Sequence, residues 1–284
     1  MKNFVRKIFR IRLLEKILVL LLKTFPDNYL LKGLTSQNNY YAAKSIRNCE
    51  RYGIKYSLDI SDYQNWLLYF YCKTDNSFGV LKYVKDEFVV LDIGGNIGQT
   101  AMMMAKEVGD KGYIYSFEPY PDTFKNFKQN LSLNAALSKR IKIENYALGL
   151  SPGNVNMYQD CITNSGANRM VHGQLSKVKG FIETPVSTVD VFVKNNQLNK
   201  VDLIKIDVEG FEMNVLKGAY KTLMEFSPVL FIELDDNNLK KQGSSAVELY
   251  EFLENMDYRI YEEGKAETFN LAKVSLPVNI YCTI

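Results

Sequence analysis

Three acidic residues each close an apolar run of the kind that forms a buried strand in a parallel sheet. These runs, with the residues that close them, are 88–91 with Asp92, 113–117 with Glu118, and 201–206 with Asp207. Carboxylates can accept hydrogen bonds from hydroxyl groups, attract a cationic ligand or take up a proton during a reaction. Because open α/β sheets bind ligands beyond the carboxyl ends of their strands, we expect the three side chains to share one site.

A turn that contains glycines 94, 95 and 98 follows Asp92 and leads into a helical pattern over residues 97–108. A strand, a glycine turn and a helix begin a βαβ unit, and the glycines let the backbone approach a ligand closely. The dinucleotide-binding pattern G-x-G-x-x-G is missing, because Asn96 and Gln99 occupy glycine positions. The phosphate-binding pattern G-x-x-x-x-G-K-[ST] is also missing.

The position of Asp92 indicates the charge of the ligand. A carboxylate before the turn repels a pyrophosphate and attracts an ammonium or a sulfonium group. S-adenosylmethionine carries both groups, so the sequence favours it as the cofactor. The alternative is a glycine-rich corner in which Asp92 has only a structural role.

Glu118 closes the strand that follows the glycine turn, where an acidic residue can accept both ribose hydroxyls of a nucleoside in a bidentate hydrogen bond. Alternatively, Glu118 complements the dipole of a helix that begins near Asp122. Pro119 restricts the turn after the strand.

A third predicted strand, residues 141–147, ends near the expected position of the nucleobase, so Tyr146 and Ala147 are predicted to border the adenine. The complete set of residues predicted to bind the cofactor is Asp92, Gly94, Gly95, Asn96, Gly98, Thr100, Glu118, Pro119, Tyr146 and Ala147.

Seven apolar runs predict strands, and helical patterns lie between most of them. The strands are expected at 88–91, 113–117, 141–147, 201–207, 228–234, 258–261 and 278–283. This alternation predicts an α/β fold with a doubly wound, mostly parallel seven-stranded sheet of the Rossmann-like class. Residues 149–184 are predicted to be an irregular insertion that shapes the acceptor site.

Residues 1–54 are predicted to form a helical extension and residues 55–284 the main domain, with a helix expected over residues 30–49. Within residues 1–25, apolar side chains recur at steps of three and four and basic residues accompany them. The longest apolar run, 17–22, is far shorter than the ~20 residues of a membrane span, and a signal peptide fits poorly. This helix is expected either to pack on the main domain or to lie on an anionic membrane surface.

The composition is that of a soluble globular protein, with 46% hydrophobic and 24% charged residues. A net charge of +3 does not indicate nucleic-acid binding. The four cysteines are scattered without a C-x-x-C pair, which predicts neither a zinc site nor a disulfide framework. Reduced thiols fit a cytoplasmic protein, and the first 25 residues leave open a peripheral position on the inner membrane face.

The chain resembles FkbM-type methyltransferases over roughly residues 55–263. The resemblance depends on LDIGGNIG at 91–98, FEP at 117–119, ALG at 147–149 and, most specifically, DLIKIDVEGFE at 202–212. It implies S-adenosylmethionine as methyl donor and O-methylation of sugars or other secondary-metabolite hydroxyls. The family often has alanine where this chain has Gly95, and the first 50 residues lie outside the resemblance.

A sugar hydroxyl is a weak nucleophile, so its methylation gains from a general base within hydrogen-bond reach. Asp207, at the end of its strand, is the first candidate for this base. His172, the only histidine of the chain, is the second candidate.

The acidic residues after the fourth strand leave metal binding open. Asp207, Glu209 and Glu233 could bind a divalent cation through oxygen ligands. Glu209 and Glu212 are explained at least as well as caps of the following helix. Lys205, two residues before Asp207 on the same strand face, is expected to pair with a carboxylate.

The resulting hypothesis is an S-adenosylmethionine-dependent O-methyltransferase that acts on a hydroxyl of a saccharide, a glycan or a related secondary metabolite. The alternatives are a nicotinamide-dependent oxidoreductase and a non-catalytic, membrane-associated scaffold. No nucleic-acid partner is expected, because the insertion lacks a run of lysine and arginine. The sequence does not predict the oligomeric state.

Overall fold

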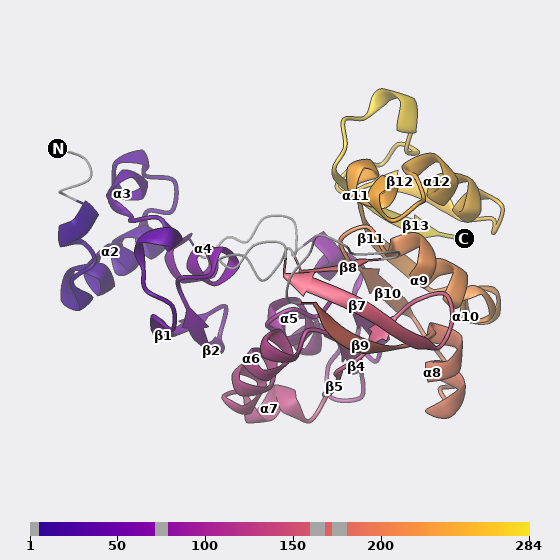
Figure 1. The fold of residues 1–284 in the computed structure, drawn as a ribbon, viewed down its shortest axis with the longest axis horizontal. Coiled ribbons are helices and arrows are strands. Elements are labelled where there is room, and N and C mark those ends of the chain that lie inside the picture. Colours follow the sequence, from indigo (N-terminus) through magenta and orange to yellow (C-terminus); the bar gives the residue numbers. More distant parts are fainter. Residues whose placement is uncertain (1–5, 72–78, 160–167, 172–180) are drawn as a thin grey trace. The chain divides into compact units, whose positions relative to one another are not determined.

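The computed structural model describes residues 6–71, 79–159, 168–171 and 181–284 (Figure 1). The chain divides into two compact units, Met1–Asp75 with Cys161–Gly166, and Asn76–Asp160 with Ala167–Ile284. Among the described residues, no helix combines the length and the apolar character that a membrane crossing requires.

The first unit combines helices with a β-hairpin. Its elements are α2 (Arg12–Thr24), α3 (Tyr29–Leu34), the 3-10 helix η1 (Asn38–Tyr40), β1 (Ile46–Arg51), β2 (Ile54–Asp59) and α4 (Tyr63–Tyr71). The hairpin turn contains Tyr52 and Gly53, both with positive φ, 55° and 73°, as a two-residue type I′ turn requires. The helix predicted over residues 30–49 is therefore wrong beyond α3. The units also divide later than the predicted boundary after residue 54, because β1 and β2 pair across that point.

The core of the first unit is built from alternate residues of β2 and one side of α2. Ile54, Tyr56 and Leu58 of β2 are buried, and α4 packs against this strand. Leu18 and Leu22 of α2 are also buried, and α2 contacts α4. The first unit therefore has a hydrophobic core of its own.

The second unit contains the predicted sheet. Its strands are β3 (Val89–Ile93), β4 (Tyr113–Phe117), β5 (Ile141–Glu144), β10 (Leu203–Ile206), β11 (Val229–Leu234), β12 (Arg259–Glu262) and β13 (Val278–Thr283). They lie in the order β12-β13-β11-β10-β3-β4-β5, and β13 is antiparallel to both of its neighbours. The predicted α/β fold with a mostly parallel seven-stranded sheet is confirmed.

Helices connect the strands and cover the sheet (Figure 1). They are η2 (Gly79–Tyr83), α5 (Gln99–Glu107), α6 (Pro121–Ser132), α7 (Ala135–Ser138), α8 (Val189–Asn195), α9 (Glu212–Gly218), α10 (Tyr220–Phe226), α11 (Asp236–Lys241), α12 (Ala246–Glu254) and η4 (Leu271–Lys273). Alternate residues of β3 and β10, such as Leu91 and Ile204, share a buried cluster with apolar residues of α8, α9 and α12. This packing fixes one face of the strands that lead to the carboxyl edge.

The segment predicted to be an irregular insertion forms strands. β6 (Ala147–Leu148), β7 (Gly153–Gln159), β8 (Asn168–Val171) and β9 (Ile182–Ser187) build a second sheet in the order β6-β9-β7-β8. Val155 and Met157 of β7 are buried with Ala147 and Phe211. The predicted third strand of the main sheet ends at Glu144, and Ala147 belongs to the second sheet.

Candidate active site

The direction in which successive strands are added reverses beside β3. The chain runs from β3 to β4 and β5 on one side, and then returns to β10 on the other side of β3. Open α/β sheets bind ligands at such a switch point, beyond the carboxyl ends of the strands. Asp92 lies near the end of β3, and Glu118 and Asp207 directly follow β4 and β10.

The strand register aligns three polar side chains across three neighbouring strands. Asp92 pairs with Lys205 of β10 on one side and with Ser116 of β4 on the other, and all three side chains are buried. The Ser116 hydroxyl donates to the Asp92 carboxylate over 2.6 Å, and the Lys205 ammonium lies 3.4 Å from its other oxygen. We call Ser116, Asp92 and Lys205 the inner row. Within it, the Asp92 carboxylate is fully enclosed.

Two residues further along the strands, a second set of residues reaches the carboxyl edge of the sheet. This outer row consists of Asn145, Glu118, Gly94, Asp207 and Glu233. The backbone N–H groups of Glu118, Gly94 and Asp207 each donate to a carbonyl of the neighbouring strand, at 3.0, 3.1 and 3.0 Å. The outer row therefore holds Glu118 and Asp207 on the two sides of Gly94.

Lys205 connects the two rows. Its ammonium donates to the Gly94 carbonyl over 3.2 Å and lies 3.4 Å from an oxygen of Asp207. Burial alone would lower the pKa of Lys205, but the carboxylates of Asp207 and Asp92 outweigh it and raise this pKa above its ordinary value. Lys205 is therefore charged at neutral pH and fixes both carboxylates.

Glu118 holds the glycine turn through its carboxylate. One oxygen accepts from the Asn96 N–H over 2.9 Å, and the other accepts from the Tyr120 N–H over 2.9 Å. Burial raises the pKa of Glu118 to about 7, although these two hydrogen bonds act in the opposite direction. Tyr120 is the N-cap residue of α6, so the hydrogen bond from its N–H to Glu118 also fixes the residue at which this helix begins. Each carboxylate oxygen keeps a second lone pair for a further donor.

Gly94 and Gly98 are required by packing inside the protein. Both have positive φ, 90° and 85°, which glycine adopts without strain. A Cβ on Gly94 would overlap the backbone oxygen of Asp207, and a Cβ on Gly98 would overlap the ring of Phe127. The sequence had attributed these glycines to close approach of a ligand, whereas protein atoms already occupy the space.

Three further residues of the predicted cofactor set lie around this turn. Gly95 is buried, and a Cβ there would meet the hydroxyl of Ser116. Asn96 has a φ of 46°, and its Oδ1 is buried without a hydrogen-bond partner among the described residues. Thr100 is buried in the first turn of α5.

Asn145 fixes the turn after β4 and was not predicted. Its amide donates to the carbonyls of Glu118 and Pro119 over 2.9 and 3.1 Å. The available signal was its position, since Asn145 directly follows a strand just as Glu118 does. Tyr146 is half-buried and Ala147 is buried beside β7; that they border an adenine stays a prediction.

Glu212 holds the turn that precedes α9. One of its carboxylate oxygens accepts from the N–H groups of Val208 and Gly210 over 3.2 and 3.0 Å. Burial raises the pKa of Glu212 to about 7 against these hydrogen bonds. The side chain therefore stabilises a turn through this oxygen, while its other oxygen is buried without a hydrogen-bond partner among the described residues.

Glu233 and Glu209 complete the acidic region. The charge of Asp207, followed by burial, raises the pKa of Glu233 above its ordinary value. Glu209 accepts from the Asn238 amide over 2.9 Å. In the described part of the chain, no three His, Cys, Asp or Glu residues are grouped so that they could hold a metal ion. The cation site suggested for Asp207, Glu209 and Glu233 is therefore not formed.

Residues 92–260 match the Methyltransferase FkbM domain family. The match covers more than half of the chain and includes every residue of the inner and outer rows. The chain belongs to this family. The resemblance noted in the sequence is thereby confirmed.

Several curated methyltransferases are related to this FkbM methyltransferase. Methyltransferase 1 of Beauveria bassiana is 30% identical over 179 residues, which are 57% of this chain and 70% of that protein. Hexuronic acid methyltransferase AglP of Haloferax volcanii is 27% identical over 151 residues, 53% of this chain and 58% of that protein. The 2-O-methyltransferase NoeI of Sinorhizobium fredii is 26% identical over 167 residues, 55% of this chain and 66% of that protein. The match thus spans less than two thirds of AglP and of NoeI.

Other predicted features of the FkbM methyltransferase lie elsewhere. His172 lies outside the described residues.

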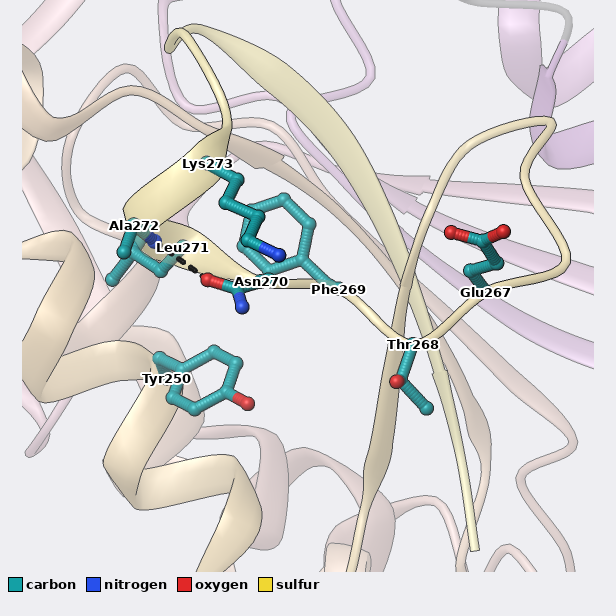
Figure 2. Close-up of a pocket in the computed structure, with 8 residues that line it drawn as sticks. All are labelled: Tyr250, Glu267, Thr268, Phe269, Asn270, Leu271, Ala272 and Lys273. Atoms are coloured by element: carbon teal, nitrogen blue, oxygen red, sulfur yellow. Dashed lines mark hydrogen bonds between the residues drawn. The ribbon is translucent and has the colours of Figure 1, made fainter.

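A hollow lined by Tyr250 and residues 267–273 lies on the loop between β12 and β13 (Figure 2). Figure 2 shows the Tyr250 ring across from this loop, where the Asn270 carboxamide oxygen accepts from the Ala272 N–H over 3.1 Å. None of the predicted site residues lines this hollow.

Proposed function

We propose that this FkbM methyltransferase transfers a methyl group from S-adenosylmethionine to a hydroxyl of a saccharide, a glycan or a related secondary metabolite. The observation that carries the proposal is the outer row. It combines a buried carboxylate that holds the glycine turn, Glu118, with a partly exposed carboxylate, Asp207, at the switch point of the sheet.

The residues at the glycine turn suit a donor that carries hydroxyl groups and positive charge. Oδ1 of Asn96 is a buried acceptor without a hydrogen-bond partner among the described residues, whereas Oδ1 of Asp92 lies 3.4 Å from the Lys205 ammonium. Glu118 would hold the ribose hydroxyls with its remaining lone pairs, and Gly94 and Asn96 would contact the donor. The enclosed Asp92 would support this turn through Ser116 and Lys205. The proposal extends to the other residues of the predicted set, Gly95, Gly98, Thr100, Pro119, Tyr146 and Ala147.

Asp207 is the proposed general base. When bound, S-adenosylmethionine supplies a methyl group on a positively charged sulfur. The Asp207 side chain is 44% exposed, so an acceptor can reach it, and its carboxylate takes the proton of the acceptor hydroxyl. Lys205 keeps this carboxylate in position. Glu233 lies beside Asp207 in the outer row, and the charge of Asp207 raises the pKa of Glu233.

The saccharide acceptor is proposed from the names of two relatives. AglP is a hexuronic acid methyltransferase and NoeI is a 2-O-methyltransferase. Both names agree with transfer to an oxygen atom of a sugar. Membership of a methyltransferase family also argues against the nicotinamide-dependent oxidoreductase, which would be recognised by binding of NADH.

Calorimetry with S-adenosylhomocysteine tests the donor site. Glu118→Ala removes two charge-assisted hydrogen bonds to the ribose, so affinity should fall roughly tenfold to a hundredfold. Glu144→Ala is the matched control, because Glu144 lies on the adjacent strand and pairs with Lys142 near the surface. Equal affinity of Glu118→Ala and the unmodified protein would remove the ribose assignment.

Transfer of a labelled methyl group to a panel of hexuronic acids and glycans tests the reaction. Asp207→Asn keeps the shape of the side chain but cannot take a proton. We expect kcat to fall about 10²- to 10⁴-fold with little change in affinity for S-adenosylhomocysteine. An unchanged kcat would exclude Asp207 as the base.

A further inference from the structure

Helix α2 has two apolar sides, and only one of them packs inside the first unit. Leu18 and Leu22 are buried toward α4. Leu13, Ile17 and Leu20 lie on another side of the helix, with exposed fractions of 68%, 44% and 64%. Their spacing of four and three residues places them in one row along the helix. We call these three residues the α2 apolar row.

More apolar side chains are exposed at the ends of α2 and on α3, which contacts α2. They are Ile11, Leu21, Phe25, Tyr29 and Leu30. Single exposed hydrophobic residues are common, but a concentration of them on two adjoining helices marks an interaction surface.

A row of basic residues borders the α2 apolar row. Lys16 lies three residues after Leu13 and four before Leu20, and Lys23 lies three residues after Leu20, so both are neighbours of the apolar row on the helix surface. Arg12 lies one turn before Lys16.

The single carboxylate of α2 does not offset these charges. Glu15 is fully buried, and its carboxylate pairs with the Arg47 guanidinium over 2.5 Å. The outward side of α2 is therefore apolar along one row and positively charged along the next.

The basic row also borders a hollow. Arg12 and Lys16 line it together with Ile46 and Asn48 of β1. Two cations and an amide around one hollow provide hydrogen-bond donors that suit a phosphate group.

We propose that the first unit binds the surface of an anionic lipid bilayer through this side of α2. The α2 apolar row enters the boundary of the acyl chains, and Arg12, Lys16 and Lys23 contact the phosphate headgroups. A second copy of the chain fits less well, because two such surfaces would bring their basic rows together. The inference does not depend on the proposed methyl transfer.

Flotation of the full chain with vesicles tests the proposal. We expect the chain to float with phosphatidylcholine vesicles that contain phosphatidylglycerol, far less with pure phosphatidylcholine, and less at high salt. Equal flotation with both vesicle types, or none with either, would overturn the proposal. These comparisons use the unmodified protein and do not depend on the folding of a variant.

Two triple variants separate the apolar and the basic contributions. Leu13→Ser/Ile17→Ser/Leu20→Ser should weaken binding to the anionic vesicles at least about tenfold, and Arg12→Gln/Lys16→Gln/Lys23→Gln should weaken it roughly a hundredfold. The matched controls replace exposed residues of the second unit, Leu150→Ser/Met224→Ser/Val247→Ser and Lys125→Gln/Lys128→Gln/Lys139→Gln, and should bind like the unmodified protein.

Circular dichroism and light scattering accompany the flotation. Equal binding by the α2 variants and the controls would overturn the proposal. A self-associated chain that the apolar triple variant converts to monomers, with no effect on flotation, would also overturn it and identify the surface as an interface between copies.

Discussion

At the level of single residues, Lys205 forms ion pairs with two carboxylates. Its ammonium lies 3.4 Å from an oxygen of Asp92 and 3.4 Å from an oxygen of Asp207. Removing one partner of a buried ion pair leaves an uncompensated charge, which costs about 3–5 kcal/mol. Asp207 is partly exposed, so we expect Lys205→Met to lower the free energy of unfolding by about 3 kcal/mol. Urea denaturation measures this change.

The control for Lys205→Met is Lys142→Met, which removes a lysine from a partly exposed pair with Glu144 on β5. Such pairs contribute about 0–1 kcal/mol. The double variant Lys205→Met/Asp92→Asn should recover part of the lost stability, because it also removes the enclosed negative charge. A Lys205→Met variant as stable as Lys142→Met would contradict the ion-pair account.

The raised pKa of Glu212 predicts that the stability of the protein depends on pH. Burial raises its folded pKa from 4.5 to about 7, so between these values the folded state binds a proton that the unfolded state does not. Stability from this group is therefore fully present below about pH 4.5 and is lost as pH rises through about 7. Glutamine does not ionise, so Glu212→Gln should gain up to about 3 kcal/mol relative to the unmodified protein between pH 4.5 and pH 8.

Urea denaturation of both proteins across this pH range measures the difference. Glu118 and Glu233 also have raised pKa values and are present in both proteins. The contribution of Glu118 cancels when the two curves are subtracted, whereas the pKa of Glu233 falls in Glu212→Gln because the Glu212 charge is lost. Parallel curves for the two proteins would show that Glu212 does not titrate in this way.

The sequence was sufficient to find residues whose position depends on a strand end. Glu118 and Asp207 follow apolar runs, so their common location at one edge could be predicted, whereas Asp92 lies two residues further inside, level with Ser116 and Lys205. Ser116 could not be found this way, because its role depends on the register that aligns it with Asp92. Such a register is a property of the assembled sheet and has no local signal in either strand.

At the level of elements, the turn between β3 and α5 packs tightly against β4. A Cβ on Gly95 would meet the Ser116 hydroxyl and approach the ring of Phe127. Gly95→Ala should therefore displace Ser116 from Asp92 and lower the free energy of unfolding by about 1–3 kcal/mol. Thermal and urea unfolding measure this cost.

Gly95→Ala/Ser116→Ala should be more stable than Gly95→Ala alone, because the second substitution removes the atom that the new Cβ meets. Gly153→Ala is the control, since nothing lies near its Cβ position. A Gly95→Ala cost no larger than that of Gly153→Ala would show that Ser116 has room to move.

The secondary-structure predictions were wrong where a residue pattern favoured one element and the structure forms another. The run 30–49 contains helix-forming residues, but Tyr52-Gly53 with positive φ directs residues 46–51 into a hairpin. In the insertion, Val155 and Met157 alternate with Asn154 and Asn156, which is the period of a strand. The partner of this strand, β9, lies more than 20 residues away, so the pairing could not be predicted from neighbouring residues.

At the level of the whole molecule, the two compact units have different proposed roles, methyl transfer in the second unit and membrane binding in the first. The family match begins at Asp92, and both rows of the site lie in the second unit. The first unit has its own core and carries the α2 surface. Stability and binding should therefore respond separately to substitutions in each unit.

A substitution of Glu15 tests whether the stability of the first unit is independent of ligand binding by the second. It is fully buried, pairs with Arg47, and accepts from the Tyr69 hydroxyl over 3.2 Å. Glu15→Gln removes the charge that compensates Arg47, so we expect the first unit to lose about 3 kcal/mol of stability. Hydrogen exchange should increase in residues 6–71, while the affinity of the second unit for S-adenosylhomocysteine stays within about twofold.

Asp27→Asn is the matched control for Glu15→Gln, because Asp27 lies in the same unit and forms an exposed pair with Lys32, 3.7 Å apart. Exposed pairs contribute about 0–1 kcal/mol, so hydrogen exchange in this variant should match that of the unmodified protein. If Glu15→Gln instead increased exchange throughout residues 79–284 and weakened S-adenosylhomocysteine binding to the same degree, the two units would unfold as one. The core of the first unit would then contribute to the stability of the methyltransferase site.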